Sequence, residues 1–141
     1  MGKTVQSIKI KNTPDKVWAR IRDFHDLSWA PNVISKCSAV GNNGGNQVGA
    51  KRILNDAFHE TMTGLDESSR TMRYTIDDGP SPIASNEVAG YEGVICVTDP
   101  GDGSAQVDWN SSWKSGADEE VHDFCHPIYT ALLNDMKASL E

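Results

Sequence analysis

The sequence predicts an α+β fold in which a curved antiparallel sheet of about seven strands wraps around a long C-terminal helix. Apolar and polar residues alternate in short segments that turn signals separate, as is typical of an antiparallel meander. From about residue 118 to residue 140, apolar residues instead recur three and four positions apart, as in an amphipathic helix. A chain of 141 residues can bury its own core, so we expect a single domain over residues 1–141.

The N-terminal part is expected to hold one strand and two helical segments. Residues 4–11 alternate as in a strand, and Thr13 followed by Pro14 suits the N-cap and the first position of a helix. That helix is expected to run to about Asp23. Residues 24–29 are expected to form a second short helical piece, which the proline two positions further on would stop.

Six strands are expected to follow as a meander. The glycine-rich run at residues 41–47 predicts a flexible hairpin turn rather than a phosphate loop, because no Lys-Ser/Thr pair and no helix follow it. Asn55-Asp56 predicts a tight turn, and residues 78–85 are the one long irregular connection. The expected strands are residues 33–40, 47–54, 57–65, 71–77, 87–98 and 105–114.

The charge balance argues against two classes of partner. With 20 acidic and 13 basic residues, the formal net charge is −7, so the chain repels phosphate backbones and we expect no nucleic-acid partner. No apolar run approaches the length of about 20 residues that spans a bilayer, so we expect no membrane insertion. The start lacks an apolar signal-peptide core, which favours a cytoplasmic location. The three cysteines are odd in number and are expected to be buried free thiols.

The strand expected at residues 57–65 carries a carboxylate on its apolar side. Strand side chains alternate between faces, so Glu60 points the same way as Phe58 and Met62. This arrangement makes sense where the apolar side lines a cavity rather than a solid core. Mostly apolar walls with a few polar groups are typical of small-molecule pockets. Alternation predicts these inward-facing residues: Val48, Ala50, Arg52, Leu54, Phe58, Glu60, Met62, Met72, Tyr74, Ile76, Tyr91, Ile95, Val97, Val107, Trp109, Ser111 and Trp113.

Arg52 and Glu60 fall on neighbouring antiparallel strands on either side of the tight turn, so we expect them close to opposite each other. Two interpretations stay open. They are a buried ion pair that holds the sheet together, since buried charges normally occur only when paired. Alternatively, they orient a polar group of an otherwise apolar ligand.

Weak motifs along nearly the whole chain match a known family in order and spacing. They are Val17-Trp18 through Phe24, Trp29-Ala30-Pro31, residues 48–52, Glu60 with Leu65-Asp66, Arg70 with Tyr74, residues 79–82 and residues 107–109. The chain resembles the START-like, helix-grip (SRPBCC) superfamily of the birch pollen allergen. Within it, the chain is most similar to bacterial polyketide cyclase/dehydrase-type proteins related to the plant abscisic-acid receptors. It departs from them in having Gly90-Tyr91 where relatives commonly have Asn-Tyr, and in lacking the receptors' gate loop at Asn55-Asp56.

The resemblance implies a helix-grip fold with a cavity between the sheet and the last helix. In the family, a glutamate at the place of Glu60 faces this cavity and can hydrogen-bond ligand through water. We therefore expect the protein to bind a small, mostly apolar molecule, such as a polyketide, an isoprenoid or a lipid-like metabolite, with no cofactor. The expected ligand-binding residues are Arg52, Phe58, Glu60, Met62, Tyr74, Tyr91, Trp109, Ser111, Phe124 and Ile128.

Two alternative functions would use the same cavity. In a polyketide cyclase or dehydratase, Glu60 would be the base, Arg52 the electrostatic stabiliser, and Tyr74 or Tyr91 the proton donor. In a ligand-gated interaction protein, the loop at residues 79–85 would act as a lid that docks on a protein partner.

The expected last helix also carries two histidines at a spacing that suits a metal. His122 and His126 are four residues apart, so their side chains lie on one side of the helix. Both fall on the flank of the apolar stripe, and no further ligand stands at diagnostic spacing. We interpret them as solvated histidines and expect no metal site.

Overall fold

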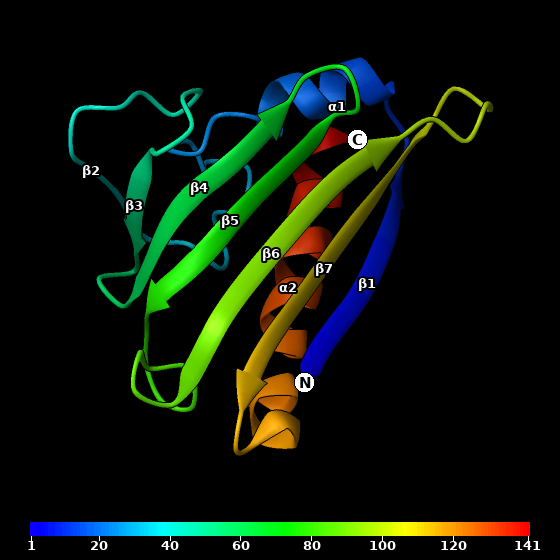
Figure 1. The fold of residues 1–141 in the computed structure, drawn as a ribbon. Helices are drawn as coiled ribbons and strands as arrows, with labels where there is room; N and C mark the ends of the chain where they lie inside the picture. Colours follow the sequence, from blue (N-terminus) through cyan, green and yellow to red (C-terminus); the bar gives the residue numbers. More distant parts are fainter.

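The computed structural model describes residues 1–141, and a seven-stranded antiparallel sheet packs against one long helix (Figure 1). The strand order across the sheet is β1-β7-β6-β5-β4-β3-β2. Strands β2 to β7 therefore form a meander, and β1 lies beside β7, which confirms the predicted fold class. The elements are β1 (Gly2–Ile10), α1 (Pro14–Ile21), β2 (Cys37–Val40), β3 (Lys51–Leu54), β4 (Phe58–Asp66), β5 (Thr71–Asp78), β6 (Val88–Thr98), β7 (Ala105–Ser115) and α2 (Asp118–Leu140).

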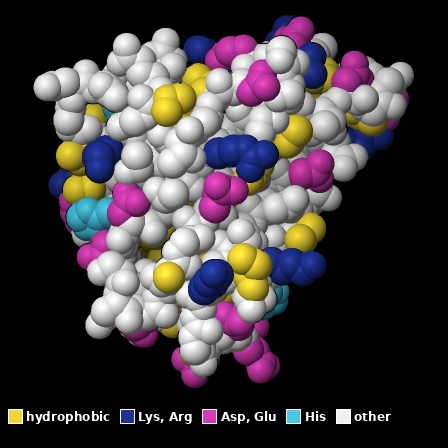
Figure 2. All heavy atoms as spheres, viewed as in Figure 1, with side chains coloured by type: hydrophobic (Ala, Val, Ile, Leu, Met, Phe, Trp, Pro, Cys, Tyr) yellow, Lys and Arg dark blue, Asp and Glu magenta, His cyan; other side chains and the backbone are white.

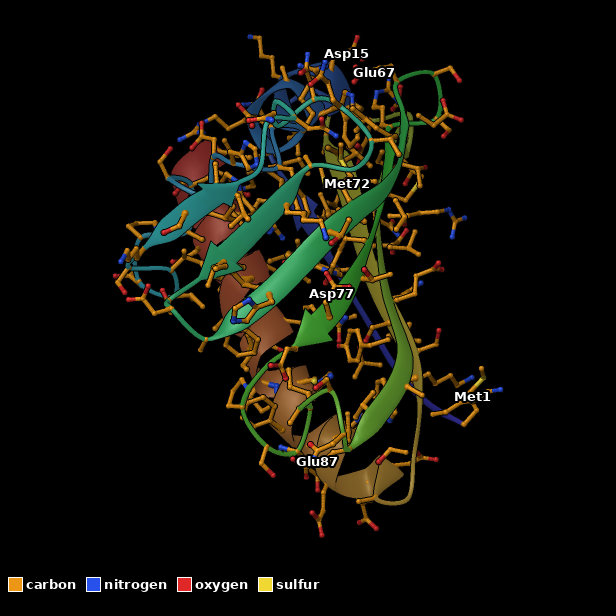
Figure 3. The ribbon with its side chains drawn as sticks, turned by 60° about the vertical axis from the view of Figure 1, so that its left-hand side comes forward. Met1, Asp15, Glu67, Met72, Asp77 and Glu87 are labelled. Carbon is orange, nitrogen blue, oxygen red and sulfur yellow. The ribbon has the colours of Figure 1, made fainter.

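The helix α2 runs along the inner, concave face of the sheet (Figures 1 and 3). Burial alternates along β6 and β7, so every second side chain of these strands is turned away from solvent. Phe124 and Ile128 of α2 are half-buried, at the margin of the side that the helix turns to the sheet. The buried residues of α2 are Val121, Cys125, Tyr129, Leu132, Leu133, Asp135 and Met136.

The predicted start of α1 is confirmed. The Thr13 hydroxyl accepts a hydrogen bond from the Lys16 backbone N–H, and Pro14 occupies the first turn, where no intrahelical donor is needed. Val17, Trp18 and Ile21 are buried beneath the sheet end, as their spacing predicts for one face of a helix.

The second short helical piece expected at residues 24–29 is wrong, because these residues form turns. The Asp23 carboxylate accepts the His25 N–H at 2.9 Å, and the Asp26 carboxylate accepts the Ser28 N–H at 2.9 Å. Such side-chain bonds to nearby backbone compete with helical hydrogen bonds. The Phe24 N–H is also taken by the Gly45 carbonyl at 2.9 Å, which ties the segment to a distant loop.

Strands β2 and β3 are shorter than predicted. Gly49 has a φ of +96°, which interrupts the extended chain before β3 and leaves Val48 57% exposed rather than facing inward. Before β2, the Asn55 side chain accepts the N–H groups of Ser35 and Lys36 at 2.8 and 3.2 Å, which holds residues 33–36 as a loop. The residue just before this loop, Asn32, donates from its backbone and side-chain nitrogens to the Asp135 carboxylate of α2.

The outer face of the sheet carries charged side chains of both signs, and Figure 2 shows Lys and Arg interspersed with Asp and Glu. An example is the exposed pair of Arg73 and Glu92, with 3.3 Å between nitrogen and oxygen. The three cysteines are free, as predicted, but only Cys125 is fully buried and the other two are half-buried. None of the helices combines the length and the apolar character that a membrane crossing requires.

Candidate ligand cavity

A cavity of about 190 Å³ lies between the inner face of the sheet, α2 and the loop that leads into β2. Of the 17 residues that line it, 14 are hydrophobic, and the only basic and acidic residues among them are Arg52 and Glu60. The lining residues are Leu27, Val33, Ile34, Arg52, Leu54, Asn55, Phe58, Glu60, Tyr74, Ile76, Ile83, Tyr91, Trp109, Cys125, Ile128, Tyr129 and Leu132.

The turn between β3 and β4 sets the two charged residues opposite each other. Asn55 and Asp56 have φ values of +54° and +55°, as the central residues of a type I′ hairpin turn require. The resulting register makes Arg52 and Glu60 direct partners across the ladder, as predicted. The nitrogens Nε and Nη2 of Arg52 lie 2.8 and 2.7 Å from one carboxylate oxygen, Oε1 of Glu60. Both side chains are at least 94% buried, since they are 5% and 6% exposed.

Further contacts hold the guanidinium group in place. Its Nη1 donates to the Phe24 carbonyl at 2.9 Å, and its central carbon lies 3.8 Å from the centroid of the Phe24 ring. Arg52 therefore joins β3 to the turns at residues 24–29, which the sequence patterns predicted to be helical. The ring contact is a cation–π interaction in a site with little water, where such interactions are strongest.

Glu60 keeps one oxygen without a partner. Both bonds from Arg52 go to Oε1, and no protein group donates to Oε2. Burial is the main influence on this carboxyl group and raises the pKa of Glu60 above its ordinary value, although the Arg52 guanidinium acts in the opposite direction. Glu60 thus brings an acceptor without a protein donor to the wall of the cavity.

Three tyrosine hydroxyls meet in the wall of the cavity. The Tyr129 hydroxyl of α2 lies 3.0 Å from that of Tyr74 on β5 and 2.6 Å from that of Tyr91 on β6. Trp109 Nε1 donates to the Tyr74 hydroxyl at 2.9 Å, and Tyr91 donates to the Ser111 hydroxyl at 3.1 Å. Burial raises the pKa of each of the three tyrosines, so all three phenols are neutral at physiological pH.

Two glycines of β6 make this meeting possible. Tyr74 faces Gly93 across the ladder, and a Cβ atom at Gly93 would lie 2.2 Å from the Tyr74 ring. Gly90 has a φ of +62° within a register shift between Ala89 and Glu92, which is the geometry of a glycine-dependent β-bulge. The bulge turns Tyr91 inward, where its ring stacks on Trp113 with 5.6 Å between centroids.

Comparison with known proteins agrees with this architecture. The model of the family "polyketide cyclase / dehydrase and lipid transport" matches residues 1–141. The chain belongs to this family. The match confirms the START-like resemblance, whereas the relation to the plant abscisic-acid receptors stays a prediction. No curated protein matches the chain.

Solved structures of similar proteins share the whole fold. A protein from Nitrosospira multiformis is 38% identical, with a TM-score of 0.95 over 99% of this chain and 96% of that one. XoxI from Bacillus cereus is 24% identical, with a TM-score of 0.82 over 99% and 96%. A protein from Thermobifida fusca is 22% identical, with a TM-score of 0.84 over 97% and 91%. The last two are similar in fold alone.

Seven of the ten residues expected to bind ligand line the cavity, namely Arg52, Phe58, Glu60, Tyr74, Tyr91, Trp109 and Ile128. The other three do not. Met62 is fully buried in the core, and Ser111 reaches the cavity wall only through its hydrogen bond with Tyr91. Phe124 packs almost parallel to Phe58, with 6.3 Å between ring centroids, and so supports a wall residue from behind.

Sequence reasoning missed Tyr129, which joins the phenol cluster. A signal for it existed, because Tyr129 is four residues after Cys125 and therefore lies on the same side of α2. Leu27, Val33 and Ile34 were also missed. They come from turns and a loop, and hydrogen bonds between residues far apart in sequence, such as that from the Phe24 N–H to the Gly45 carbonyl, help to hold these segments in place.

The loop at residues 79–85 contributes one wall residue. Ile83 is 3% exposed and lines the cavity, while the Asp78 carboxylate accepts the N–H groups of Gly79 and Ser85 at 3.0 and 2.9 Å. Glu87, two residues after this loop, lies at the end of the molecule where α2 begins (Figure 3). The segment expected as a lid is therefore part of the cavity wall.

The histidine pair of α2 lies outside the cavity. His122 and His126 are half-buried, the His122 side chain is still 45% exposed to solvent, and the two rings stack with 5.3 Å between centroids. Nowhere in the chain do three or more His, Cys, Asp or Glu side chains converge as ligands of a metal ion.

Proposed function

We propose that this protein binds a small, mostly apolar organic molecule in the cavity between the sheet and α2. The observation that carries the proposal is a cavity with 14 hydrophobic residues among 17 and a single unpartnered carboxylate oxygen at Glu60. Apolar walls supply the affinity of such sites, and a few polar groups orient the ligand. Membership of a family described by polyketide chemistry and lipid transport supports the same class of ligand.

The volume limits the ligand. Pockets for drug-sized molecules measure about 300–1,000 Å³, and an apolar cavity of about 150 Å³ in another protein is known to hold benzene. A cavity of about 190 Å³ therefore suits a molecule of one or two rings. Among the three ligand types expected from the sequence, this favours a compact polyketide or isoprenoid over a lipid with a long acyl chain.

The test is a native mass spectrum of the freshly purified protein, followed by one under denaturing conditions. A discrete added mass that denaturation releases would support the proposal and would identify the ligand. Cys125→Phe is a suitable control variant, because Cys125 is 4% exposed and lines the cavity, so that a larger side chain takes up ligand space. Its folding is checked by urea unfolding. An added mass that persists in this variant would place the ligand elsewhere on the protein.

An enzymatic use of the same cavity is the second candidate. It rests on Glu60, whose pKa is raised by burial beside an unpartnered oxygen, as is common for catalytic bases. Glu60 would remove a proton from the substrate, Arg52 would stabilise the developing negative charge, and Tyr74 or Tyr91 would return a proton. Turnover of a cyclisation-prone polyketide chain that is lost in Glu60→Gln would support this candidate. Binding of the same chain without turnover would contradict it.

Ile83 gives the third function a physical basis. Because this residue lines the cavity, a bound ligand would contact the loop at residues 79–85 and change the surface that the loop offers to a partner. Amide hydrogen exchange of this loop measures the effect. Slower exchange in the presence of ligand would support ligand gating, and unchanged exchange would contradict it.

A further inference from the structure

We infer that the cavity selects a neutral ligand that carries a hydrogen-bond donor, such as a phenol, enol or alcohol on one or two rings, and discriminates against carboxylates. This inference rests on the proposed binding function and names the ligand chemistry. It follows from the donors and acceptors that the cavity wall leaves free.

The first free group is an acceptor. Glu60 is 6% exposed, lines the cavity and uses only Oε1 in its bonds with Arg52. Its other oxygen has no donor within the protein. The Glu60 side chain is buried as a whole, so a ligand hydroxyl that donates to this oxygen makes a charge-assisted hydrogen bond in a site of low dielectric constant.

The cavity offers no free positive charge for an anionic ligand. Arg52 is the only basic residue in the wall, and its guanidinium already bonds Glu60 and the Phe24 carbonyl and stacks on the Phe24 ring. A ligand carboxylate would bring a second negative charge into the same low-dielectric space as Glu60. Two carboxylates in one buried site repel each other, so an acid binds only if it takes up a proton or breaks the ion pair.

The phenols have no proton to spare for a ligand carbonyl. Tyr91 donates its single hydroxyl proton to Ser111, so it can only accept in its contact with Tyr129. Tyr129 therefore donates to Tyr91 and must accept from Tyr74, which in turn accepts from Trp109 Nε1. Each phenol proton and the indole proton is thereby used, and only lone pairs remain for a ligand.

The remaining polar wall residue, Asn55, also bonds to the protein through both ends of its amide. The amide nitrogen of Asn55 donates to the Val33 carbonyl at 2.9 Å, and its oxygen accepts from Ser35 and Lys36. The strongest hydrogen-bonding group left to a ligand is thus the Glu60 carboxylate oxygen, since Arg52 and Asn55 already donate to oxygens of the protein. A ligand with a donor matches this acceptor, and a ketone or an ether does not.

Four probes that share one ring system separate these cases. They are naphthalene, 2-methoxynaphthalene, 2-naphthol and 2-naphthoate, titrated calorimetrically against the wild-type protein at neutral pH. We expect 2-naphthol to bind roughly ten to a hundred times more tightly than naphthalene, because a hydrogen bond to a charged group has this effect on an affinity. We expect 2-methoxynaphthalene to gain nothing over naphthalene, and 2-naphthoate to bind more weakly than naphthalene.

Two variants test whether Glu60 causes the preference for a ligand with a hydrogen-bond donor. Glu60→Gln should reduce the advantage of 2-naphthol over naphthalene to less than about threefold, because a neutral amide oxygen is a weaker acceptor than a carboxylate. Glu92→Gln makes the same chemical change on the outer face, where Glu92 contacts Arg73, and should leave the advantage intact. The comparison of probes on the wild-type protein remains decisive if Glu60→Gln does not fold.

The outcomes distinguish a failure of this inference from a failure of the proposed binding function. Equal affinities for 2-naphthol and naphthalene would overturn the donor preference while leaving an apolar binding cavity. Tightest binding of 2-naphthoate would also overturn it, and would mean that Arg52 leaves Glu60 to pair with the ligand. Failure of all four probes to bind would overturn the proposed function together with the inference.

Discussion

Arg52→Met is expected to lower the free energy of unfolding by about 4–6 kcal/mol, most of it from the charge that it leaves behind. The variant keeps an apolar stem but strands Glu60, which is 6% exposed, without a counter-charge. Breaking a buried pair in this way costs about 3–5 kcal/mol. The lost hydrogen bond to the Phe24 carbonyl adds about 1 kcal/mol.

The double variant Arg52→Met/Glu60→Leu separates the contribution of the ion pair from the cost of leaving one of its charges unpaired. Glu60→Leu alone strands the guanidinium and is expected to cost about 3–5 kcal/mol, whereas removing both charges is often neutral or stabilising by about 1–4 kcal/mol. We therefore expect the double variant to lie within about 2 kcal/mol of the wild type. The decreases in the free energy of unfolding of the two single variants would then add up to several kcal/mol more than the decrease in the double variant, as for residues in direct contact.

Urea unfolding followed by the fluorescence of the four tryptophans measures all three variants. With a slope of about 1–3 kcal/mol per molar urea, each single variant should lower the midpoint by more than about 1 M. Arg73→Met is the matched control. Arg73 pairs with Glu92 at 3.3 Å on the exposed face, where an ion pair contributes less than about 1 kcal/mol. Losses in the two single variants that simply add in the double variant would refute the reasoning.

Three further predictions concern the phenols, the glycine of β6 and the pH dependence of binding. Tyr129→Phe should lower the free energy of unfolding by about 1–3 kcal/mol, because the Tyr74 proton loses its acceptor; an unchanged urea midpoint would contradict this. Gly93→Ala should cost about 1–3 kcal/mol and weaken naphthalene binding, because its Cβ would displace the Tyr74 ring; full stability with unchanged binding would argue against that packing. The affinity for 2-naphthol should be highest above the pKa of Glu60, which burial raises, and should fall as the pH drops through that pKa, whereas the affinity for naphthalene should not change with pH. Calorimetric titrations at several pH values test this, and the same pH dependence for both probes would contradict it. The charged and titratable groups that act on Glu60 or respond to it are Arg52, Cys37, Tyr74 and Asp77.

Local backbone rules were enough to predict the charged half of the candidate site. Side-chain alternation placed Glu60 on the inner face, and the tight turn at Asn55-Asp56 placed Arg52 opposite it. Both rules depend only on neighbouring residues, so they hold before any tertiary contact forms. The same rules failed at Val48, because the positive φ of Gly49 interrupts the alternation.

The loop that forms one wall of the cavity could not be predicted in this way. Residues 24–29 contain apolar residues with a helical spacing, yet Asp23 and Asp26 bind nearby backbone and the Gly45 carbonyl takes the Phe24 N–H. A bond between residues that are far apart in sequence leaves no local pattern. Leu27 and Ile34 therefore reach the cavity through contacts that only the folded chain contains.

The sequence by itself determined the antiparallel meander, the long amphipathic helix and the Arg52–Glu60 pair, because periodicity and turn chemistry are local properties of the chain. Only the tertiary structure decided that three tyrosine hydroxyls from β5, β6 and α2 would meet. That meeting depends on the bulge at Gly90, the space above Gly93 and the path of α2 across the sheet. The size of the cavity, and thus the size of the ligand, follows from the same long-range packing.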